Sequence, residues 1–581
     1  MTLDPSQYTN IVELLSDRAA RHPERTALTF LGDGENVTRT FTYGSLNEHV
    51  RAVGARLAER AAPGDRALLL FPNGPDYVVS FLACLYAGLI AVPAYPPPSN
   101  ALQHWSRLVS MAKDAAPRLV LTESALLPAI TAAQGMVPEL AGVQGLATDE
   151  VDLSLARSFQ FARPRPEQVA LLQYTSGSTA VPKGVMVSHA NIVAGERAIE
   201  AAFSMNADDV VVSWLPLFHD MGLIGTLLQP LYQGVPGVLL APQHFMERPE
   251  RWLHAISRHR GTVSGAPDFA YRLAALRVDP RAQQGLDLSS WRLAFCGAEP
   301  IRHETLSAFS DKFAAAGFDA GALYPCYGLA ESTLLVTGGR RGEGARAARF
   351  DARALGEGRA LEADGPASSQ ALVNCGKAQP EHDVVVVHVD TAEPVGDGEV
   401  GEIRVAGPSV TQGYWNNAEA TAQTFFASRG RTWLRTGDLG FMRDGELFVT
   451  GRQKDLIIVR GHNLYPQDIE RSVEDGFDVV RKGRTIAFAW DESGEESIAV
   501  AAEVNPRVQK LIDPEAVCRS ISERVAAAHG EPARLVLLLN PGAVPITSSG
   551  KLMRAACRKS WQKKKLDTFA VFELPAPRAK G

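Results

Sequence analysis

The sequence is poor in the features that mark secreted and metal-stapled proteins. Its 581 residues include only six cysteines, and no two of them form a Cys-x-x-Cys pair. Scattered cysteines in a long chain indicate a reducing compartment and argue against a disulfide framework or a structural zinc site. Residues 1–15 carry Asp4 and Glu13 and show no basic, apolar signal sequence. We therefore expect a soluble protein of the cytoplasm.

Long hydrophobic runs and an excess of one charge are also missing. The most apolar stretch, residues 77–95, has an uninterrupted core of about fifteen residues, shorter than the roughly 20 that a spanning helix needs. The net charge is −6, so no overall positive field would hold a nucleic acid. With 45% hydrophobic and 21% charged residues, the composition predicts a packed globular protein that neither crosses a membrane nor binds nucleic acid.

Apolar runs alternate with helical patterns in the first half of the chain. We expect strands at 66–71, 89–92 and 118–122, and a helix at 77–87. This alternation is typical of α/β architecture with much parallel sheet. No internal repeat at a solenoid period is visible.

The pattern becomes richer in β-structure after about residue 372. Residues 383–389 are densely β-branched, and 396–401 have the spacing G-x-G-x-x-G. We interpret 396–401 as a hairpin turn, because a strand follows where the dinucleotide motif needs a helix. Asp444-Gly445 marks a second hairpin. Residues 338–369 are rich in Gly, Ala, Arg and Glu, which leaves open a flexible excursion or a small accessory element.

The most informative stretch is 174–184, which places four serine and threonine hydroxyls, two glycines and Lys183 after an apolar strand at 169–173. Backbone N–H groups in a Gly-rich turn form an anion-binding concavity, to which a lysine adds charge. The stretch is not a Walker A loop, because a proline precedes Lys183. The alternatives are a phosphate-binding loop and an ordinary polar surface loop.

Five further clusters carry groups suited to chemistry. A carboxylate at Glu331 suits Mg²⁺, which takes one or two carboxylates plus substrate phosphates. Asp438 on a tight turn suits ribose hydroxyls, and Lys551 extends from a loop of small residues near the C-terminus. Taken singly, each cluster is explained as well by structure as by function. The clusters are Trp214–Leu223, Phe295–Pro300, Tyr327–Ser332, Arg435–Leu439 and Thr547–Lys551.

In their order and spacing these clusters resemble the adenylate-forming superfamily of acyl-CoA ligases, peptide-synthetase adenylation domains and luciferases. The resemblance covers about residues 40–554. It implies that ATP and Mg²⁺ are bound, with Lys551, Glu331 and His219 in catalytic roles and Glu331 as the metal ligand. The triphosphate would contact Thr175, Ser176, Gly177, Ser178, Thr179 and Lys183. Adenine and ribose would contact Gly297, Ala298, Glu299, Tyr327, Gly328, Asp438 and Arg452.

Within that superfamily the chain is most similar to the fatty acyl-AMP ligases. The similarity lies in His219–Gly225, in Gly461–Glu470 and in an extra segment at about 349–370, where that group carries an insertion limiting domain motion and CoA use. Two positions depart from the pattern. Ala180 stands where many relatives have a loop glycine, and Cys296 stands where a polar residue is common, which puts an adenine contact by that side chain in doubt.

The resemblance implies a large N-terminal domain over 1–453, made of mixed α/β subdomains and a β-rich subdomain. A small mobile α+β domain would follow over 454–581, with Lys454 as the hinge. We expect the insertion to dock on the large domain through Phe350, Leu355 and Leu361. Met221, Ile224 and Phe269 are candidates for an acyl tunnel, although core packing explains them equally well.

The implied reaction is activation of a fatty acid to acyl-AMP with release of pyrophosphate. The acyl group would then pass to the phosphopantetheine thiol of a holo acyl carrier protein on a separate chain, since no carrier domain follows Arg554. The alternatives are a fatty acyl-CoA ligase, with the same first step, and a catalytically idle nucleotide-binding regulator. The sequence gives neither the acyl chain length nor the oligomeric state.

Overall fold

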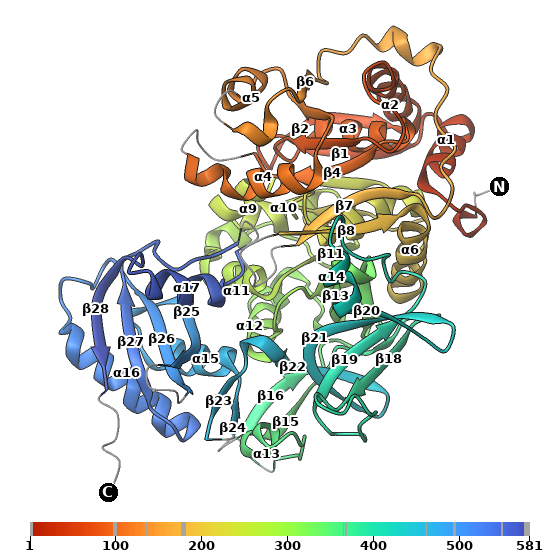
Figure 1. Ribbon diagram of the computed structural model, residues 1–581. Coiled ribbons are helices and arrows are strands. Elements are labelled where there is room, and N and C mark those ends of the chain that lie inside the picture. Colours follow the sequence, from red (N-terminus) through yellow and green to blue (C-terminus); the bar gives the residue numbers. More distant parts are fainter. Residues whose placement is uncertain are drawn as a thin grey trace, which may run out of the picture.

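The structure is a computed structural model that describes residues 4–96, 102–134, 137–175, 182–363, 365, 369–460, 462–491, 496–547 and 550–574. Figure 1 shows the chain running from an N-terminal layer through a central sheet and a β-rich layer to a C-terminal part at one side. None of the described helices is long and apolar enough to cross a membrane.

The central sheet has nine strands in the order β17-β14-β13-β12-β11-β9-β10-β1-β2. Pairing is parallel from β13 through β12, β11, β9 and β10 to β1, so the carboxyl ends of these strands share one edge. In parallel sheets this edge is where ligands bind. The strands are β1 (Thr26–Leu31), β2 (Val37–Thr42), β9 (Val211–Ser213), β10 (Gly237–Leu240), β11 (Val263–Ala266), β12 (Leu293–Cys296), β13 (Leu323–Leu329), β14 (Leu334–Gly338) and β17 (Lys377–Ala378).

A second sheet has six strands in the order β6-β5-β3-β4-β7-β8 and is parallel except for the β7–β8 hairpin. Thr175, the last residue of β7, pairs with Lys183, the first residue of β8, so the Ser/Thr/Gly stretch connects the two strands at this end of the hairpin. The strands are β3 (Arg66–Leu70), β4 (Ile90–Ala94), β5 (Leu119–Thr122), β6 (Gln144–Ala147), β7 (Val169–Thr175) and β8 (Lys183–Ser188).

The third sheet is β-rich and antiparallel. It contains β18 (Asp383–Val387), β19 (Gly401–Ala406), β20 (Phe425–Ser428), β21 (Arg431–Arg443) and β22 (Glu446–Arg452). Residues 396–401 lead into the strand β19, as predicted, and not into the helix that the dinucleotide motif needs. The chain reversal that follows β18 lies earlier, at 388–393, because Val387 already forms an antiparallel bridge with Pro394. Asp444-Gly445 joins β21 to β22 as predicted, with both residues at positive φ.

The C-terminal part forms its own four-stranded sheet, β25-β26-β27-β28, with two apolar cores made of residues between 457 and 572. A short hairpin, β23 with β24, precedes it. Its elements are β23 (Ile457–Val459), β24 (His462–Leu464), α15 (Pro466–Gly476), β25 (Val480–Asp491), β26 (Glu496–Val504), α16 (Pro514–His529), β27 (Ala533–Leu539), α17 (Arg554–Gln562) and β28 (Thr568–Glu573). The basic run after Trp561 lies at the end of α17.

Helices cover the remaining faces of the sheets, which confirms the α/β class. The predicted helix at 77–87 is α3, and its residues from Tyr77 to Tyr86 are all buried. The α-helices are α1 (Ile11–Arg21), α2 (Tyr43–Ala58), α3 (Pro75–Tyr86), α4 (Leu102–Ala115), α5 (Leu127–Gln134), α6 (His189–Phe203), α8 (Gln229–Gln233), α9 (Pro242–Glu247), α10 (Glu250–Arg258), α11 (Asp268–Arg277), α12 (His303–Phe313) and α14 (Ala418–Thr424).

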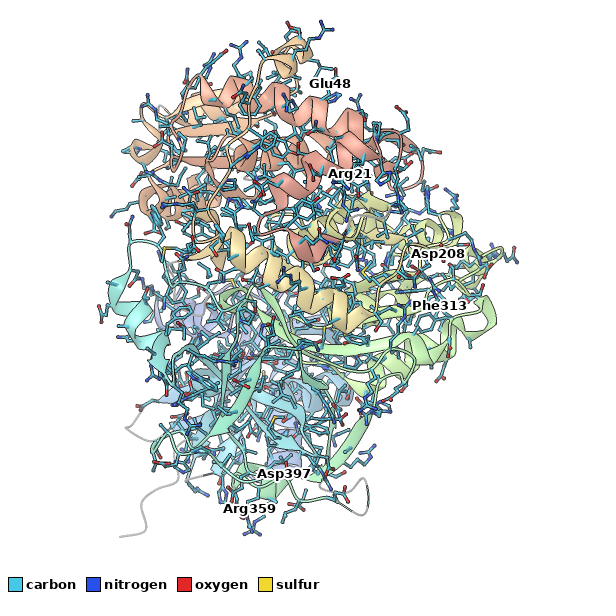
Figure 2. The ribbon with its side chains drawn as sticks, turned by 90° about the vertical axis from the view of Figure 1, so that its right-hand side faces the viewer. Arg21, Glu48, Asp208, Phe313, Arg359 and Asp397 are labelled. Atoms are coloured by element: carbon cyan, nitrogen blue, oxygen red, sulfur yellow. The ribbon has the colours of Figure 1, made fainter. Side chains whose placement is uncertain are left out.

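The segment at about 349–370 is an ordered accessory element where it is described. It consists of β15 (Ala347–Asp351), α13 (Ala352–Gly356) and β16 (Ser369–Val373), with β15 and β16 paired. Phe350 and Leu355 are fully buried in a cluster with Phe441 and Phe448 of the β-rich sheet. Figure 2 shows Arg359 of this segment next to Asp397 of the β18–β19 connection, where the backbone of Arg359 forms an isolated antiparallel β-bridge with that of Glu399.

One predicted anchor of this segment is wrong. Leu361 is 51% exposed, whereas Phe350 and Leu355 are buried. The strand β15 and the helix α13 carry the two buried side chains inward, but Leu361 lies in the irregular connection beyond α13 and faces solvent. Of the three predicted anchors, Phe350 and Leu355 therefore pack on the sheet, where Leu372 of β16 joins them.

We predict that Phe350→Ala destabilises the accessory element and the sheet beneath it by about 3–5 kcal/mol, because a buried aromatic ring is replaced by a cavity. Leu361→Ala is the matched control and should change stability by no more than about 0.5 kcal/mol. Urea unfolding, followed by hydrogen exchange at β21 and β22, measures both. Equal effects of the two substitutions would contradict the assignment of Phe350 as the anchor.

Candidate active site

The predicted site residues meet at one cavity of about 990 Å³. The carboxyl ends of β9, β11, β12 and β13 open into it, together with the β7–β8 hairpin, the β21–β22 pair and the loop before α17. The residues predicted from sequence that line it are Thr175, Lys183, His219, Met221, Phe269, Gly297, Ala298, Glu299, Tyr327, Gly328, Glu331, Asp438, Arg452, Lys454 and Lys551. Ser176, Gly177, Ser178, Thr179 and Ala180 lie outside the described residues.

Asp438 is the centre of one half of the site. It is buried, and its two carboxylate oxygens accept a hydrogen bond from the Tyr327 hydroxyl (2.8 Å) and pair with the Arg452 guanidinium (2.9 Å). The register of β21 and β22 places Asp438 directly opposite Arg452. Asp438 raises the pKa of Arg452, and burial, followed by the Asp438 charge, raises that of Tyr327. The three groups thus form one fixed charged unit on the cavity wall.

Glu331 and Lys183 both contact Tyr414, a residue that the sequence analysis missed. The Tyr414 hydroxyl donates to Glu331 Oε1 at 2.8 Å, and the Lys183 ammonium lies 4.8 Å from the centre of the Tyr414 ring. Glu331 belongs to the 3₁₀ turn η8 (Ala330–Ser332) that ends β13. No local sequence signal marks Tyr414, because its partners are 83 and more residues away.

These groups fit a magnesium ion that takes most of its oxygen ligands from bound phosphates and water. Among the described residues no three His, Cys, Asp or Glu side chains cluster as a metal cage. One carboxylate at this part of the cavity wall, Glu331, is the arrangement expected when Mg²⁺ takes its other oxygens from phosphates and water. Lys183, over the Tyr414 ring, adds positive charge to the same region.

The turn after β12 contains a strained residue, and two carboxylates there accept backbone hydrogen bonds, each from the segment that carries the other. Ala298 has a φ of +69°, which a side chain rarely adopts. Glu299 accepts a hydrogen bond from the Phe269 backbone N–H (2.6 Å) at the start of α11, while Asp268 accepts from the Arg302 N–H (2.9 Å) just before α12. Burial raises the pKa of Asp268 to about 7 and that of Glu299 above its ordinary value. Asp268 is a second cavity residue that the sequence analysis missed.

His219 and Asp220 lie where the chain leaves β9 and enters a short helix, α7 (Asp220–Gly222), that continues as a π-helix, η4 (Leu223–Leu228). His219 Nδ1 is 3.3 Å from Asp220 Oδ1, which also accepts the Met221 N–H. Burial raises the pKa of Asp220, but His219, Lys551 and the Met221 N–H together lower it below its ordinary value.

Two of the three residues predicted to line an acyl tunnel lie at the cavity, and the third does not. Met221 and Phe269 line the cavity, whereas Ile224 is 1% exposed and packs in the apolar core beneath it. Gly222 and Gly225 line the cavity beside Met221, whereas Ile224, in the wider turn of the π-helix, does not. A lining role for Ile224 is therefore not supported. Other apolar lining comes from Trp214, which begins the cluster Trp214–Leu223, and from Phe203, Met246, Leu273 and Leu334, which belong to none of the clusters.

Lys551 enters the cavity from the C-terminal part. Its backbone N–H donates to Thr547 Oγ1 (3.0 Å), which closes the loop that carries it. Burial lowers the pKa of Lys551, whereas Asp220, Glu299 and Asp438 favour its charged form. Gly550 lies within van der Waals reach of the Phe269 ring.

Comparison with known proteins agrees with this geometry. The sequence profile of the family described as AMP-binding enzyme matches residues 15–415. A medium-chain-fatty-acid–(acyl-carrier-protein) ligase of Moorena producens is 38% identical, with 97% of each chain covered. A long-chain-fatty-acid–AMP ligase of Mycobacterium marinum is 37% identical, with 95% of this chain and 97% of the relative covered.

A solved structure shows the same arrangement. The fatty acyl-adenylate ligase of Legionella pneumophila, in complex with acyl adenylate and pyrophosphate, is 38% identical, covers 99% of both chains and superposes with a TM-score of 0.76. These relatives confirm the resemblance stated from the sequence motifs. The chain belongs to the AMP-binding enzyme family.

Proposed function

We propose that this chain activates a fatty acid with ATP to form acyl-AMP and pyrophosphate, and passes the acyl group to the phosphopantetheine thiol of a separate acyl carrier protein. The observation that carries the proposal is the convergence of Lys551, Asp438 and Glu331 on one cavity that continues between apolar side chains. Relatives named as fatty-acid–carrier-protein and fatty-acid–AMP ligases support the substrate and the acceptor.

The wall of the cavity supplies the groups that ATP needs. Asp438, fixed by Tyr327 and Arg452, would accept hydrogen bonds from the ribose hydroxyls. The strained Gly297-Ala298-Glu299 turn and the Tyr327 ring would hold the adenine. Lys183 and Thr175 would hold the triphosphate at the β7–β8 hairpin. Mg²⁺ on Glu331 and phosphate oxygens would neutralise charge on the pyrophosphate.

The first step is in-line displacement at the α-phosphorus. A carboxylate oxygen of the fatty acid forms a bond to that phosphorus, and the bond to the bridging oxygen of pyrophosphate breaks. Most of the rate gain then comes from alignment and charge stabilisation. Lys551 would contact both the carboxylate and the α-phosphate; burial lowers its pKa, whereas Asp220, Glu299 and Asp438 favour its charged form.

The second step transfers the acyl group to sulfur. The thiol sulfur attacks the acyl carbonyl carbon, AMP leaves with the electron pair of the carbon–oxygen bond, and the thiol proton passes to solvent. His219, held beside Asp220, lies in the cavity wall where the carboxyl end of the substrate would be bound. The apolar residues around Trp214 and Leu273 would take the acyl chain.

Contacts of the accessory element support a carrier protein over CoA as the acceptor. It is anchored on the β-rich sheet by Phe350 and Leu355, and its strand β16 carries Gln370, whose amide donates to Asp468 of α15 at 2.8 Å. The element thus joins the β-rich sheet to the C-terminal part across the proposed hinge at Lys454, which lies in the 3₁₀ turn η9 (Gln453–Asp455). Such a link would restrict rotation and with it access of free CoA.

The test of the function is acyl-AMP and pyrophosphate formation from fatty acids of short to long chain, with CoA and holo-carrier protein offered in parallel. Carrier acylation without acyl-CoA supports the proposal. Acyl-CoA as the main product would make the chain a fatty acyl-CoA ligase, and no pyrophosphate release with any fatty acid would contradict both.

Asp438→Ala should lower acyl-AMP formation by about 100-fold, because the ribose contacts go and Arg452 is left without its partner. Tyr327→Phe keeps the ring and removes only the hydroxyl, so it should cost about 3–10-fold, mainly in the KM for ATP. Pyrophosphate exchange at varied ATP measures both. Near-normal turnover of Asp438→Ala would show that the nucleotide lies elsewhere.

Glu331→Gln should also abolish acyl-AMP formation and weaken the dependence of the rate on Mg²⁺, because the metal loses its charged protein ligand. Tyr414→Phe is the control, since it removes the hydrogen bond to Glu331 but leaves the carboxylate in place. The rate is measured over a magnesium titration. An unchanged magnesium profile in Glu331→Gln would place the metal on other groups.

Lys551→Ala should lower adenylation by about 100-fold yet still pass a supplied acyl-AMP to the carrier, because its charge acts on the α-phosphate in the first step only. Separate assays of the two half-reactions give the result. Equal loss of both would contradict this division of roles.

Deletion of 349–370 should leave adenylation largely intact and permit some acyl-CoA formation, because the link between the sheet and α15 is removed. Gln370→Ala is the matched partial change, which breaks only the bond to Asp468. Mass spectrometry with CoA as the sole acceptor shows the product. Normal adenylation with no acyl-CoA in either variant would count against gating by this element.

A further inference from the structure

The helix α15 presents two different faces to its surroundings. Ile469 and Val473 are fully buried in the core of the C-terminal part, and Glu470 binds Arg554 within that part. The remaining face carries Asp468, Arg471 and Glu474 at a spacing of three residues, so these side chains lie one above another. This face points away from the C-terminal core and toward the large part of the protein.

All three residues of this face have partners across the boundary. Asp468 accepts from Gln370 of the accessory element, and Arg471 lies 3.8 Å from Glu304 of α12. Glu474 pairs with Arg272 of α11 (3.3 Å) and with Arg302, just before α12 (3.8 Å). Figure 1 shows the C-terminal part, in blue, beside the green segment that contains α11 and α12.

Glu474 is the most enclosed of the three. Its side chain is 2% exposed, and its second oxygen accepts the Gly483 backbone N–H at 2.7 Å, so the carboxylate is fixed from its own part as well. Gly483 has a φ of +73°, and a side chain there would collide with the Arg272 guanidinium. The backbone of β25 therefore approaches α11 closely at the point where the ion pairs form.

This contact is coupled to the site through α11 and α12. Arg302 donates its backbone N–H to Asp268, and Asp268 begins α11 next to Phe269, which Glu299 caps. The Lys551 loop reaches Phe269 from the other side. The segments of α11 and α12 thus contact the turn proposed to hold adenine, and they carry the Phe269 ring and both arginine partners of Glu474, Arg272 and Arg302.

We propose that Glu474 is a positioning residue that holds the C-terminal part in the orientation that places Lys551 in the cavity. A buried carboxylate with two arginines across a boundary favours this orientation over any other in which all three charges would have to be paired elsewhere or hydrated. Loss of the pair lowers the population of the orientation competent for adenylation. The inference rests on the proposed function, and on the two half-reactions being separable.

The protein offers a matched control for the loss of a buried ion pair. Glu503 of β26 has a side chain that is 1% exposed, pairs with Arg481 at 2.6 Å and accepts the Val544 backbone N–H. Both partners of this pair lie within the C-terminal part. Glu474→Gln and Glu503→Gln therefore remove similar interactions, of which only the first crosses the boundary.

The experiment compares these variants and Arg272→Gln in both half-reactions. Glu474→Gln and Arg272→Gln should lower the rate of acyl-AMP formation about tenfold, within the range of coupling energies between sites. Transfer from supplied acyl-AMP to holo-carrier should stay within about twofold of the wild type or rise. Glu503→Gln should change the two half-reactions in equal proportion, because it alters stability but not orientation.

A second measurement reports orientation directly. Dyes attached at Val37→Cys and Leu511→Cys, both exposed and in different parts of the protein, should show lower energy transfer in Glu474→Gln and no change in Glu503→Gln. Equal behaviour of the Glu474 and Glu503 variants in both assays would overturn the inference. Absence of acyl-AMP formation by the wild type would instead overturn the proposed function.

Discussion

One buried carboxylate holds one wall of the cavity together. Asp438 joins the end of β13 in the central sheet to β21 and β22 in the β-rich sheet through Tyr327 and Arg452. Removing three polar groups from water is costly unless each finds a partner, and here each does. Two sheets of different topology are thereby fixed relative to each other at the point where the ligand would lie.

The motifs could be predicted because each is a short local signal. Tyr327 lies near the end of β13 and Glu331 directly follows that strand, and parallel pairing brings the ends of β12 and β13 to one edge. Asp438 lies within the antiparallel strand β21, next to Gly437 at positive φ. The hairpin at Asp444-Gly445 was predicted because its turn residues lie between the two strands that they connect.

What sequence reasoning missed depends on distant contacts or on irregular backbone. Tyr414 reaches Glu331 across 83 residues, and no short pattern encodes that contact. Ile224 packs in the core, which is the alternative that the sequence left open, and the π-helix that carries it has no sequence signal that we used. Leu361 is apolar but lies beyond the elements that point Phe350 and Leu355 inward. The opposing faces of α15 are likewise visible only when their partners are in place.

The pairing of β15 with β16 has a consequence for how the enzyme can diversify. Because Asp351 pairs directly with Ser369, the segment between them leaves and re-enters the fold at adjacent points. Such a segment can be lengthened, shortened or exchanged without altering the register of any large sheet, since loop length costs little free energy once its ends are fixed. The acceptor preference that we propose for this segment could thus evolve independently of the residues proposed to bind the nucleotide.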